Sequence, residues 1–387
     1  MEENTTMQIE ALSYASGQPI SLAIESDVIR TIKPLEQTAH TKTLPYVGPG
    51  LVDLQINGYA GLDFNHGSMS PETVSRAVRA VWREGVTCFL PTIITNDDAS
   101  IRHALRAVDD ACGADPLADE GIAGVHLEGP FISPEDGPRG AHHRACVCAP
   151  SWDSFQRWQD AAGGRIRLLT LSPEWPNSVS FIERCAASGV IVSIGHTAAT
   201  SEQVADAVAA GAKLSTHLGN GAHLTLPRHP NYLWEQLAQE SLWCCMIADG
   251  FHLPNQVLKV IMKVKREQAI VVSDAVALAG MPPGAYSMPV GGQVVLTPAG
   301  RLHLAENPKL LAGSAQMLPH HISHLISHQL ANLAESWDMG STRPAALLGL
   351  PQAKGLAPGA PADLALFRLQ NGRIQIEQTI KSGIIHV

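Results

Sequence analysis

Short apolar runs alternate with amphipathic segments over most of this chain, beginning at Gly48. The runs at 51–56, 86–90 and 122–127 each precede a segment whose apolar residues recur at helical spacing, and the pattern continues to Asp274. Strand–helix units repeated about eight times predict an α/β fold, a closed (β/α)8 TIM-type barrel. An open, doubly wound sheet is the alternative, but no run is followed by a glycine-rich phosphate-binding loop.

Both ends of the chain differ from this pattern, because their strand-like runs have no helical segments between them. Turn-forming residues separate the runs near the N-terminus, and Asn371-Gly372 is a typical hairpin turn near the C-terminus. We therefore expect residues 1–47 and 355–387 to form one small β-sandwich domain. Residues 48–354 would then form the barrel.

The charge balance excludes several classes of partner. The chain has 27 Lys and Arg against 36 Asp and Glu, a net charge of −9, which argues against binding to nucleic acid or to an anionic membrane.

No apolar run approaches the roughly 18–20 residues of a membrane span. Residues 1–4 lack the basic start of a signal peptide. The 7 cysteines are an odd number without a Cys-x-x-Cys pair, so we expect reduced thiols in a cytoplasmic protein.

In a barrel, the chemistry lies where the strands end at their carboxyl side. Four residues suited to metal binding or proton transfer stand at such ends, namely Glu128, His196, His217 and Asp274. Any one of the 17 histidines is more often structural, but these four at equivalent strand ends indicate one site. One carboxylate and two imidazoles suit Zn²⁺ or a similar divalent ion and leave a position open for water. Asp274 would take a proton from that water.

Seven motifs occur in order along the chain. They are PGLVDLQING (49–58), HLEGPF (126–131), GAH (140–142), GHT (195–197), THL (216–218), ADGFH (248–252) and SDA (273–275). Together they resemble the N-acetylglucosamine-6-phosphate deacetylase family of the amidohydrolase superfamily. The segments 311–315 and 355–366 are similar to later parts of the same family, so the resemblance covers nearly the whole chain.

The resemblance implies a metal-dependent hydrolase that removes the acetyl group from an N-acetylated amino sugar. The implied substrate is N-acetylglucosamine 6-phosphate, and the products are glucosamine 6-phosphate and acetate. Glu128, His196 and His217 would hold the metal, and Asp274 would act as general base and then as general acid. These residues agree with the set derived from the strand ends.

Two side-chain amides bear on the number of metal ions that the chain can bind. Many amidohydrolases bind a second metal through a His-x-His motif, but Gln55 and Asn57 stand at those positions here. Side-chain amides are poor ligands for zinc, which prefers imidazole, thiolate and carboxylate. We therefore expect one divalent ion per chain. Zn²⁺ is favoured, with Fe²⁺, Mn²⁺ and Co²⁺ as alternatives.

Two histidines outside the metal set are implied to contact the substrate. His142 lies in a long loop after the third strand, a place suited to covering a ligand. The resemblance makes it a substrate contact that also helps hold the carbonyl oxygen. The alternative is a solvated loop histidine like its neighbour His143. The resemblance likewise makes His252 a contact to the sugar or its phosphate.

A phosphate-binding set is implied further along the chain. Asn220 and Gly221 follow His217 in a turn whose backbone N–H groups could face a phosphate. Arg228 matches the arginine that, in this family, reaches the phosphate from a neighbouring subunit. A guanidinium binds phosphate through two parallel hydrogen bonds. The resemblance therefore also implies a homodimer.

The chain departs from the family pattern near this set. The family usually has Asn-Ala-Met after the histidine and Arg-Glu-Pro-Gly later, whereas this chain has NGAH at 220–223 and RHPN at 228–231. Another N-acetyl amino sugar, or an unphosphorylated one, is therefore an alternative substrate. A cyclic-amide or N-acyl-amino-acid hydrolase on the same scaffold is a second alternative, and a non-catalytic sugar-phosphate sensor is a third.

Two clusters have no place in this function. His320, His324 and His328 recur at i, i+4 and i+8 in a helical pattern near 316–333, a spacing that can hold a metal. No acidic residue completes that set, so a partly solvated outer helix or a subunit contact is favoured. The adjacent pair Cys244-Cys245 lies in an apolar run and is expected to pack in the core.

Overall fold

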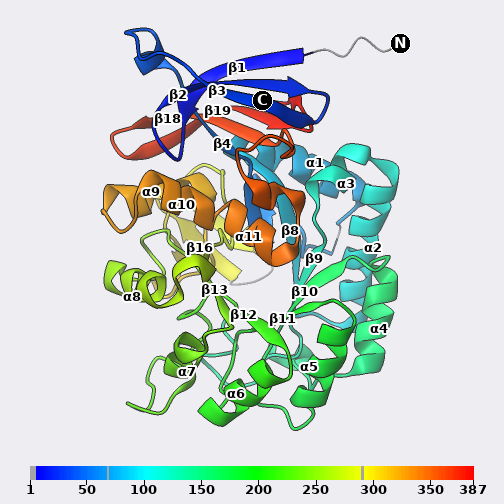
Figure 1. Cartoon of the computed structure of the whole chain (residues 1–387). Helices are drawn as coiled ribbons and strands as arrows, with labels where there is room; N and C mark the ends of the chain where they lie inside the picture. The colour runs from blue at the N-terminus through cyan, green and yellow to red at the C-terminus, as the bar shows by residue number, and fades with distance from the viewer. Residues whose placement is uncertain (1–5, 68, 289–291) are drawn as a thin grey trace.

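A computed structural model describes residues 6–67, 69–288 and 292–387 (Figure 1). Its central sheet has eight strands in the order β14-β13-β12-β11-β10-β9-β8-β5. These are β5 (Leu51–Ile56), β8 (Val86–Ile94), β9 (Val125–Glu128), β10 (Ile166–Leu171), β11 (Ile191–Ile194), β12 (Ala212–Ser215), β13 (Trp243–Met246) and β14 (Ala269–Val271). A parallel bridge between Ile56 and Ala275 joins the two ends of this order. The sheet therefore closes, and the predicted barrel is confirmed.

Helices lie between successive strands and cover the outside of the barrel (Figure 1). They are α1 (Pro71–Val81), α2 (Asp98–Ala114), α3 (Pro116–Gly121), α4 (Trp152–Ala161), α5 (Ser178–Ala187), α6 (Ser201–Ala209), α7 (Tyr232–Ala238) and α8 (Asn255–Lys265). Capping residues set where they begin. The Ser70 hydroxyl accepts a hydrogen bond from the Thr73 N–H at the start of α1 (3.2 Å), and Thr200 and Gln203 form a capping box on α6.

Apolar side chains fill the barrel away from the carboxyl ends of its strands. Val52 of β5 and Leu214 of β12 belong to one buried cluster that also contains Ala345 and Leu348 of α11 (Thr342–Leu348). This packed cluster closes one end of the barrel. The carboxyl ends of the strands are the side left for a ligand, as in other barrels of this type.

The two ends of the chain form one seven-stranded sheet in the order β20-β19-β18-β4-β1-β2-β3, next to the barrel (Figure 1). Its strands are β1 (Thr6–Ser13), β2 (Pro19–Glu25), β3 (Val28–Pro34), β4 (Tyr46–Pro49), β18 (Leu364–Gln370), β19 (Arg373–Lys381) and β20 (Ile384–Ile385). Leu22, Ile24 and Leu364 lie in one apolar cluster to which both ends contribute. The hairpin at Asn371-Gly372 is present, since Gln370 pairs with Arg373 and both turn residues have positive φ.

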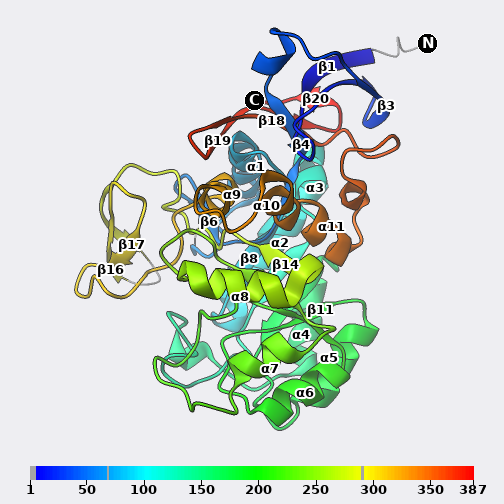
Figure 2. The same cartoon turned by 60° about the vertical axis from the view of Figure 1, so that its left-hand side comes forward.

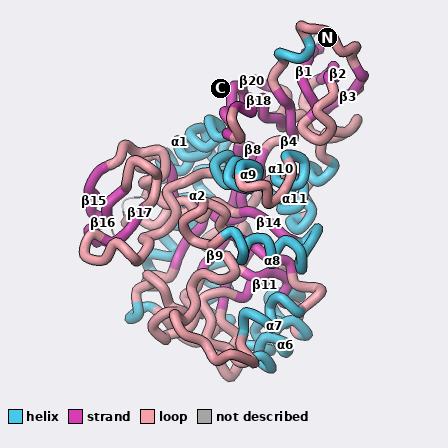
Figure 3. Tube along the Cα trace, turned by 90° about the vertical axis from the view of Figure 1, so that its left-hand side faces the viewer, coloured by secondary structure: helices cyan, strands magenta, loops and turns pink. Residues whose placement is uncertain are grey.

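A small sheet follows the last barrel strand. It consists of β15 (Gly284–Met288), β16 (Gly292–Leu296) and β17 (Leu302–Leu304), and Figure 2 and Figure 3 show it projecting from the side of the barrel, apart from the terminal sheet. The helical pattern near 316–333 is not one helix. α9 (Leu318–Ser327) ends first, and α10 (Leu333–Met339) begins anew, because the Asn332 side chain caps it by accepting from the Glu335 N–H (2.9 Å).

The adjacent cysteines are packing residues, as predicted. Cys244 and Cys245 are both buried, and alternate pointing along β13 places them in two different apolar clusters. Burial raises the pKa of both thiols, so neither is suited to act as a nucleophile. Among the described helices, none is long and apolar enough to cross a membrane.

Candidate functional site

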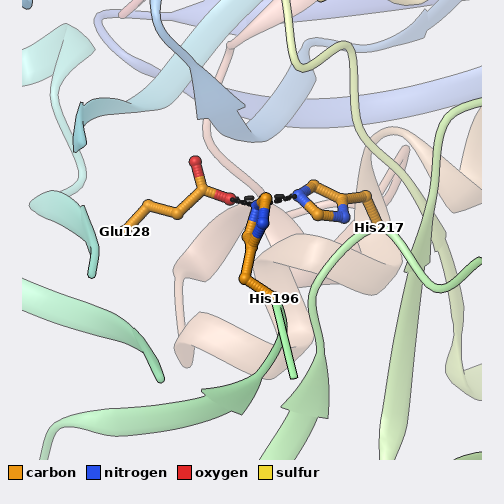
Figure 4. Close-up of side chains that lie close together, drawn as sticks. All are labelled: Glu128, His196 and His217. Carbon is orange, nitrogen blue, oxygen red and sulfur yellow. Dashed lines mark hydrogen bonds and ion pairs between the residues drawn. The ribbon is translucent and has the colours of Figure 1, made fainter. Parts of the chain in front are cut away.

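Three predicted ligands meet at the open end of the barrel. Glu128 is the last residue of β9, and His196 and His217 lie just after β11 and β12. The Nε2 atoms of the two histidines are 3.2 and 3.0 Å from Glu128 Oε1 and 3.1 Å from each other. Figure 4 shows the three side chains converging from separate strands. All three are buried.

Their geometry fits a single metal ion. Ligand atoms about 2.0–2.1 Å from Zn²⁺ at tetrahedral angles lie about 3.3 Å from one another, close to the separations seen here. His196 Nδ1–H donates to the Pro138 carbonyl (2.8 Å), which leaves Nε2 as the nitrogen that would bind a metal. Within the described ranges, Glu128, His196 and His217 are the one group of three or more His, Cys, Asp or Glu residues placed to hold a metal.

The short distances between Glu128 and the two histidines shift the pKa values of Glu128 and His217. Burial by itself would raise the pKa of Glu128, but hydrogen bonds to His196 and His217 hold it well below its usual range. Burial alone would lower the pKa of His217, and the Glu128 carboxylate raises it above its usual value instead. The carboxylate is therefore ionised, which a metal ligand must be.

Asp274 and two amides complete the centre. Asp274 follows β14, and burial raises its pKa to about 6. Asn57 Nδ2 donates to Asp274 Oδ1 (2.8 Å), and Gln55 Nε2 donates to Glu128 Oε1 (2.9 Å). The sequence excluded these amides as metal ligands but did not reveal that each one holds a carboxylate of the site. Only their position at the carboxyl end of β5, next to the other strand ends, could have suggested it.

The backbone at the strand ends is conformationally restricted. His196, His217 and Asp274 have φ of 49°, 27° and 48°, in the left-handed region that non-glycine residues rarely adopt. Such conformations cost free energy and are found preferentially at functional sites. The surrounding barrel therefore holds these three side chains at the centre in spite of local preference.

A cavity of about 390 Å³ opens above the centre, a size suited to a small ligand. Predicted site residues that line it are Glu128, His142, His196, His217, Asn220, Gly221, His252 and Asp274. The sequence did not point to Asp63 or Lys309, which also line it. Lys309 lies in the loop that follows β17, where nothing in the residue pattern indicates a site.

His142 is buried, unlike the exposed His143 beside it. Its Nδ1 lies 2.8 Å from Thr95 Oγ1, and its ring packs edge-on against that of His196, with centroids 4.4 Å apart. Burial lowers the pKa of His142 to about 3, so the ring is neutral. The solvated-loop alternative is therefore wrong for this histidine, and its position beside the metal ligands suits a contact to the reacting group.

The turn at 219–222 packs directly against the metal ligands. Asn220 Nδ2 donates to the His217 carbonyl (3.2 Å). Gly221 has φ +54, and a Cβ there would lie 2.6 Å from His196 Nδ1. A glycine is therefore required at this position to let the turn approach His196.

Arg228 lies apart from the other predicted residues. It is exposed, and it does not line the cavity. Leu224 and Trp234 in the same region are 93% and 58% exposed. Within one chain, the structure does not bring Arg228 to the site.

Among the described residues, the histidines of α9 and His328 are not part of a group placed to hold a metal. His320 and His324 are half-buried, and His328 is exposed just beyond the helix. Their ring nitrogens contact protein groups instead: His320 Nε2 lies 3.3 Å from the Asp249 carbonyl, and His324 Nε2 lies 2.7 Å from Asn255 Oδ1. The partly solvated outer helix is the interpretation that agrees with the structure.

Comparison with known proteins gives a consistent result. The family model described as "Amidohydrolase family" matches residues 46–385. The chain is 31% identical to the N-acetylglucosamine-6-phosphate deacetylase of Lysinibacillus sphaericus over 88% of this chain and 85% of that protein. It is 32% identical to the N-acetylgalactosamine-6-phosphate deacetylase of Shewanella sp. (strain ANA-3) over 81% and 77%. A solved Mycobacterium smegmatis N-acetyl-D-glucosamine-6-phosphate deacetylase, in complex with N-acetyl-D-glucosamine-6-phosphate, superposes with a TM-score of 0.86 at 25% identity, covering 99% of this chain and 100% of that one.

The close packing of Gly221 against His196 generates a prediction. Gly221→Ala should lower the free energy of unfolding by about 2–4 kcal/mol, because it adds positive-φ strain of roughly 1–2 kcal/mol to an overpacking cost of roughly 1–3 kcal/mol. Gly17→Ala is the matched control, since Gly17 has φ +67 but no atom within 4 Å of the added Cβ. Denaturant unfolding of both variants measures the difference. Equal losses would show that no collision with His196 occurs.

Proposed function

The chain belongs to the N-acetylglucosamine-6-phosphate deacetylase family of amidohydrolases, and we propose that it hydrolyses N-acetylglucosamine 6-phosphate to glucosamine 6-phosphate and acetate. One observation carries the proposal. The buried Glu128, His196 and His217 meet within hydrogen-bond distance beside Asp274, at the floor of a cavity sized for a small ligand. A sensor would need the cavity but not a carboxylate placed for proton transfer.

The cofactor we propose is one divalent ion per chain, Zn²⁺ in preference to Fe²⁺, Mn²⁺ or Co²⁺. Glu128, His196 and His217 would hold it, because two imidazoles and one carboxylate are ligands that zinc prefers. When bound, such an ion supplies Lewis acidity that activates the acetyl carbonyl and a water molecule. The hydrogen bond from Gln55 to Glu128 fixes the orientation of the ligand carboxylate.

Proton transfer falls to Asp274. Its carboxylate accepts the proton of the attacking water and then delivers it to the amine nitrogen as the amide C–N bond breaks. Asn57 donates to one oxygen, which leaves the other oxygen for the proton. His142 is anchored through Nδ1 near Thr95, and its other nitrogen would hold the carbonyl oxygen of the acetyl group in place.

Recognition of the phosphate requires a second subunit in this proposal. Asn220, Gly221 and His252 line the cavity, but Arg228 is exposed outside it. Arg228 would therefore bind the phosphate in the cavity of a neighbouring chain, in a homodimer. The exposed Leu224 and Trp234 offer apolar area for such a subunit contact. A cytoplasmic location is proposed as well, supported by 7 cysteines that are all free thiols.

Metal content tests the ligand set. Purified protein should contain about one divalent ion per chain by inductively coupled plasma mass spectrometry, and Glu128→Ala or His196→Ala should lose it, because two ligands cannot hold zinc tightly. His143→Ala is the control, since His143 is exposed and outside the cluster. Two tightly held ions per chain would contradict the inference drawn from Gln55 and Asn57.

Proton transfer is tested by Asp274→Asn. This variant should keep its metal while kcat falls by about 10²-fold or more, the usual scale for a lost general acid or base. Acetate release and metal content are measured on the same sample. Asp206→Asn changes an exposed carboxylate on α6, outside the cavity, and should leave kcat within a few-fold. Near-normal turnover by Asp274→Asn would remove Asp274 from the mechanism.

The phosphate assignment is tested by assays of N-acetylglucosamine with and without its 6-phosphate. Arg228→Ala should lower kcat/KM roughly 10–150-fold for the phosphorylated sugar, the effect of losing a charged hydrogen bond, and spare the unphosphorylated one. Arg30→Ala, on the terminal sheet, should change neither. Equal rates on both sugars by the native protein would exclude phosphate recognition. N-acetylgalactosamine 6-phosphate belongs in the same assay, because the relative from Shewanella is named for that epimer.

Mixing of variant subunits tests whether the metal centre and Arg228 of one active site come from different chains. Glu128→Ala lacks the metal centre but keeps Arg228, and Arg228→Ala keeps the metal centre. If Arg228 acts across the interface, hybrids of these two inactive or impaired variants regain activity on the phosphorylated sugar. Failure of the mixture to regain activity, with hybrid dimers present, would place Arg228 in its own subunit's site or outside any site.

A further inference from the structure

The loop that carries His252 is organised around one buried carboxylate. Asp249 is 3% exposed and follows β13 by a few residues. Its Oδ1 accepts hydrogen bonds from the backbone N–H groups of Phe251 (2.8 Å) and His252 (2.9 Å). Its Oδ2 lies 2.7 Å from His252 Nδ1. One side chain therefore fixes both the turn of the loop and the ring of His252.

This contact determines which nitrogen of His252 carries a hydrogen. Burial alone would raise the pKa of Asp249, but the His252 side chain and the backbone of the loop hold it well below its usual range, so the carboxylate can only accept. The Nδ1 atom of His252 must then be protonated, and Nε2 is the nitrogen left to face the cavity that His252 lines. The orientation and tautomer are set before any ligand arrives.

The histidines of α9 support the same loop from behind. The Ala248 N–H donates to Nδ1 of the buried His321 (3.0 Å), and His320 Nε2 lies 3.3 Å from the Asp249 carbonyl. His324 packs against Gly250, where an added Cβ would lie 2.7 Å from its Cε1. Three histidines of one helix thus contact three consecutive residues, 248–250. His328, the last member of the stripe, does not contact the loop.

We propose that Asp249 is a positioning residue for substrate recognition, acting through His252, and that the α9 histidines exist to hold the Asp249–His252 pair in place. This rests on the proposed function, in which His252 contacts the amino sugar. Asp249 itself does not line the cavity. Its effect on catalysis is therefore transmitted through the His252 ring, whose Nδ1–H it binds and whose Nε2 it aims at the substrate.

Asp249→Asn tests this with little change in shape. The Asn Oδ1 can still accept the two backbone N–H groups, but its Nδ2–H₂ group faces His252 Nδ1 and requires that nitrogen to lose its hydrogen. We expect KM for the amino-sugar phosphate to rise about 10-fold or more, the scale of one lost or reversed charged hydrogen bond, with kcat changed much less and thermal stability retained. A fall in kcat with unchanged KM would overturn the assignment.

Two further measurements distinguish positioning from a merely structural role. In a His252→Ala background, Asp249→Asn should cost nothing more in kcat/KM, because its effect passes through the missing ring. Additive losses would overturn the proposal. ¹⁵N NMR of histidine-labelled protein, with His252 assigned from His252→Ala, should show a protonated Nδ1 in the native chain and an unprotonated Nδ1 in Asp249→Asn. An Nδ1 that stays protonated in the variant would refute the mechanism.

The support from α9 is tested by comparing His321, which contacts the loop, with His328, which is exposed beyond the helix. His321→Phe removes the acceptor of the Ala248 N–H and should raise KM, whereas His328→Ala, matched in type but away from the loop, should change neither constant. Equal behaviour of the two variants would remove the support by α9 from the proposal. If the native protein releases no acetate from any N-acetyl amino sugar, the proposed function fails. The NMR result still decides whether Asp249 sets the tautomer of His252.

Discussion

The site depends on three electron-pair donors that are forced together. Glu128 Oε1 and the Nε2 atoms of His196 and His217 lie 3.0–3.2 Å apart in a buried position. Such a contact is unfavourable unless positive charge lies among them, since unpaired lone pairs and buried charge both cost free energy. The Glu128 carboxylate raises the pKa of His217 in spite of burial, so a proton on that ring can supply positive charge, and a divalent cation held by the three residues would supply it instead. These donors are kept from separating by the closed barrel and by the apolar cluster that closes its other end. The strained backbone at the strand ends also holds them in place.

The sequence predicts the features that depend on local residue patterns, and it does not predict those that depend on contacts between distant segments. Strands and helices follow from local periodicity, and in a parallel barrel all strands end on one side. Glu128, His196 and His217 could therefore be brought together without a structure. The end of α9 at Ser327 could not be predicted, because the helical spacing of apolar residues continues to residue 333, past the turn that precedes α10. Loop packing was equally hidden: nothing local distinguishes the buried His142 from the exposed His143.

The charges that line the cavity support the proposal that a second subunit completes it. Among the described residues that line it, Asp63, Glu128 and Asp274 are acidic, and Lys309 alone carries a fixed positive charge. A phosphorylated sugar brings two further negative charges. In the proposed function, the positive charge that Lys309 does not supply comes from the metal and from Arg228 of a neighbouring subunit. The exposed position of Arg228, which counts against it in an isolated chain, is what a residue acting across an interface requires.

Gln55 and Asn57, the two amides at the carboxyl end of β5, each hold one carboxylate of the site. Where Gln55 and Asn57 stand, many amidohydrolases place histidines for a second cation. Here each amide donates a hydrogen bond to one carboxylate, Gln55 to Glu128 and Asn57 to Asp274. Each carboxylate thus gains from an amide dipole part of the stabilisation that a second cation would supply. Because both amide N–H groups are already engaged, replacing them with metal ligands would leave Glu128 and Asp274 short of a partner until a second ion bound. Gln55 and Asn57 are therefore a different way of holding the same carboxylates from His-x-His, which is the basis of the proposal of one metal ion per chain.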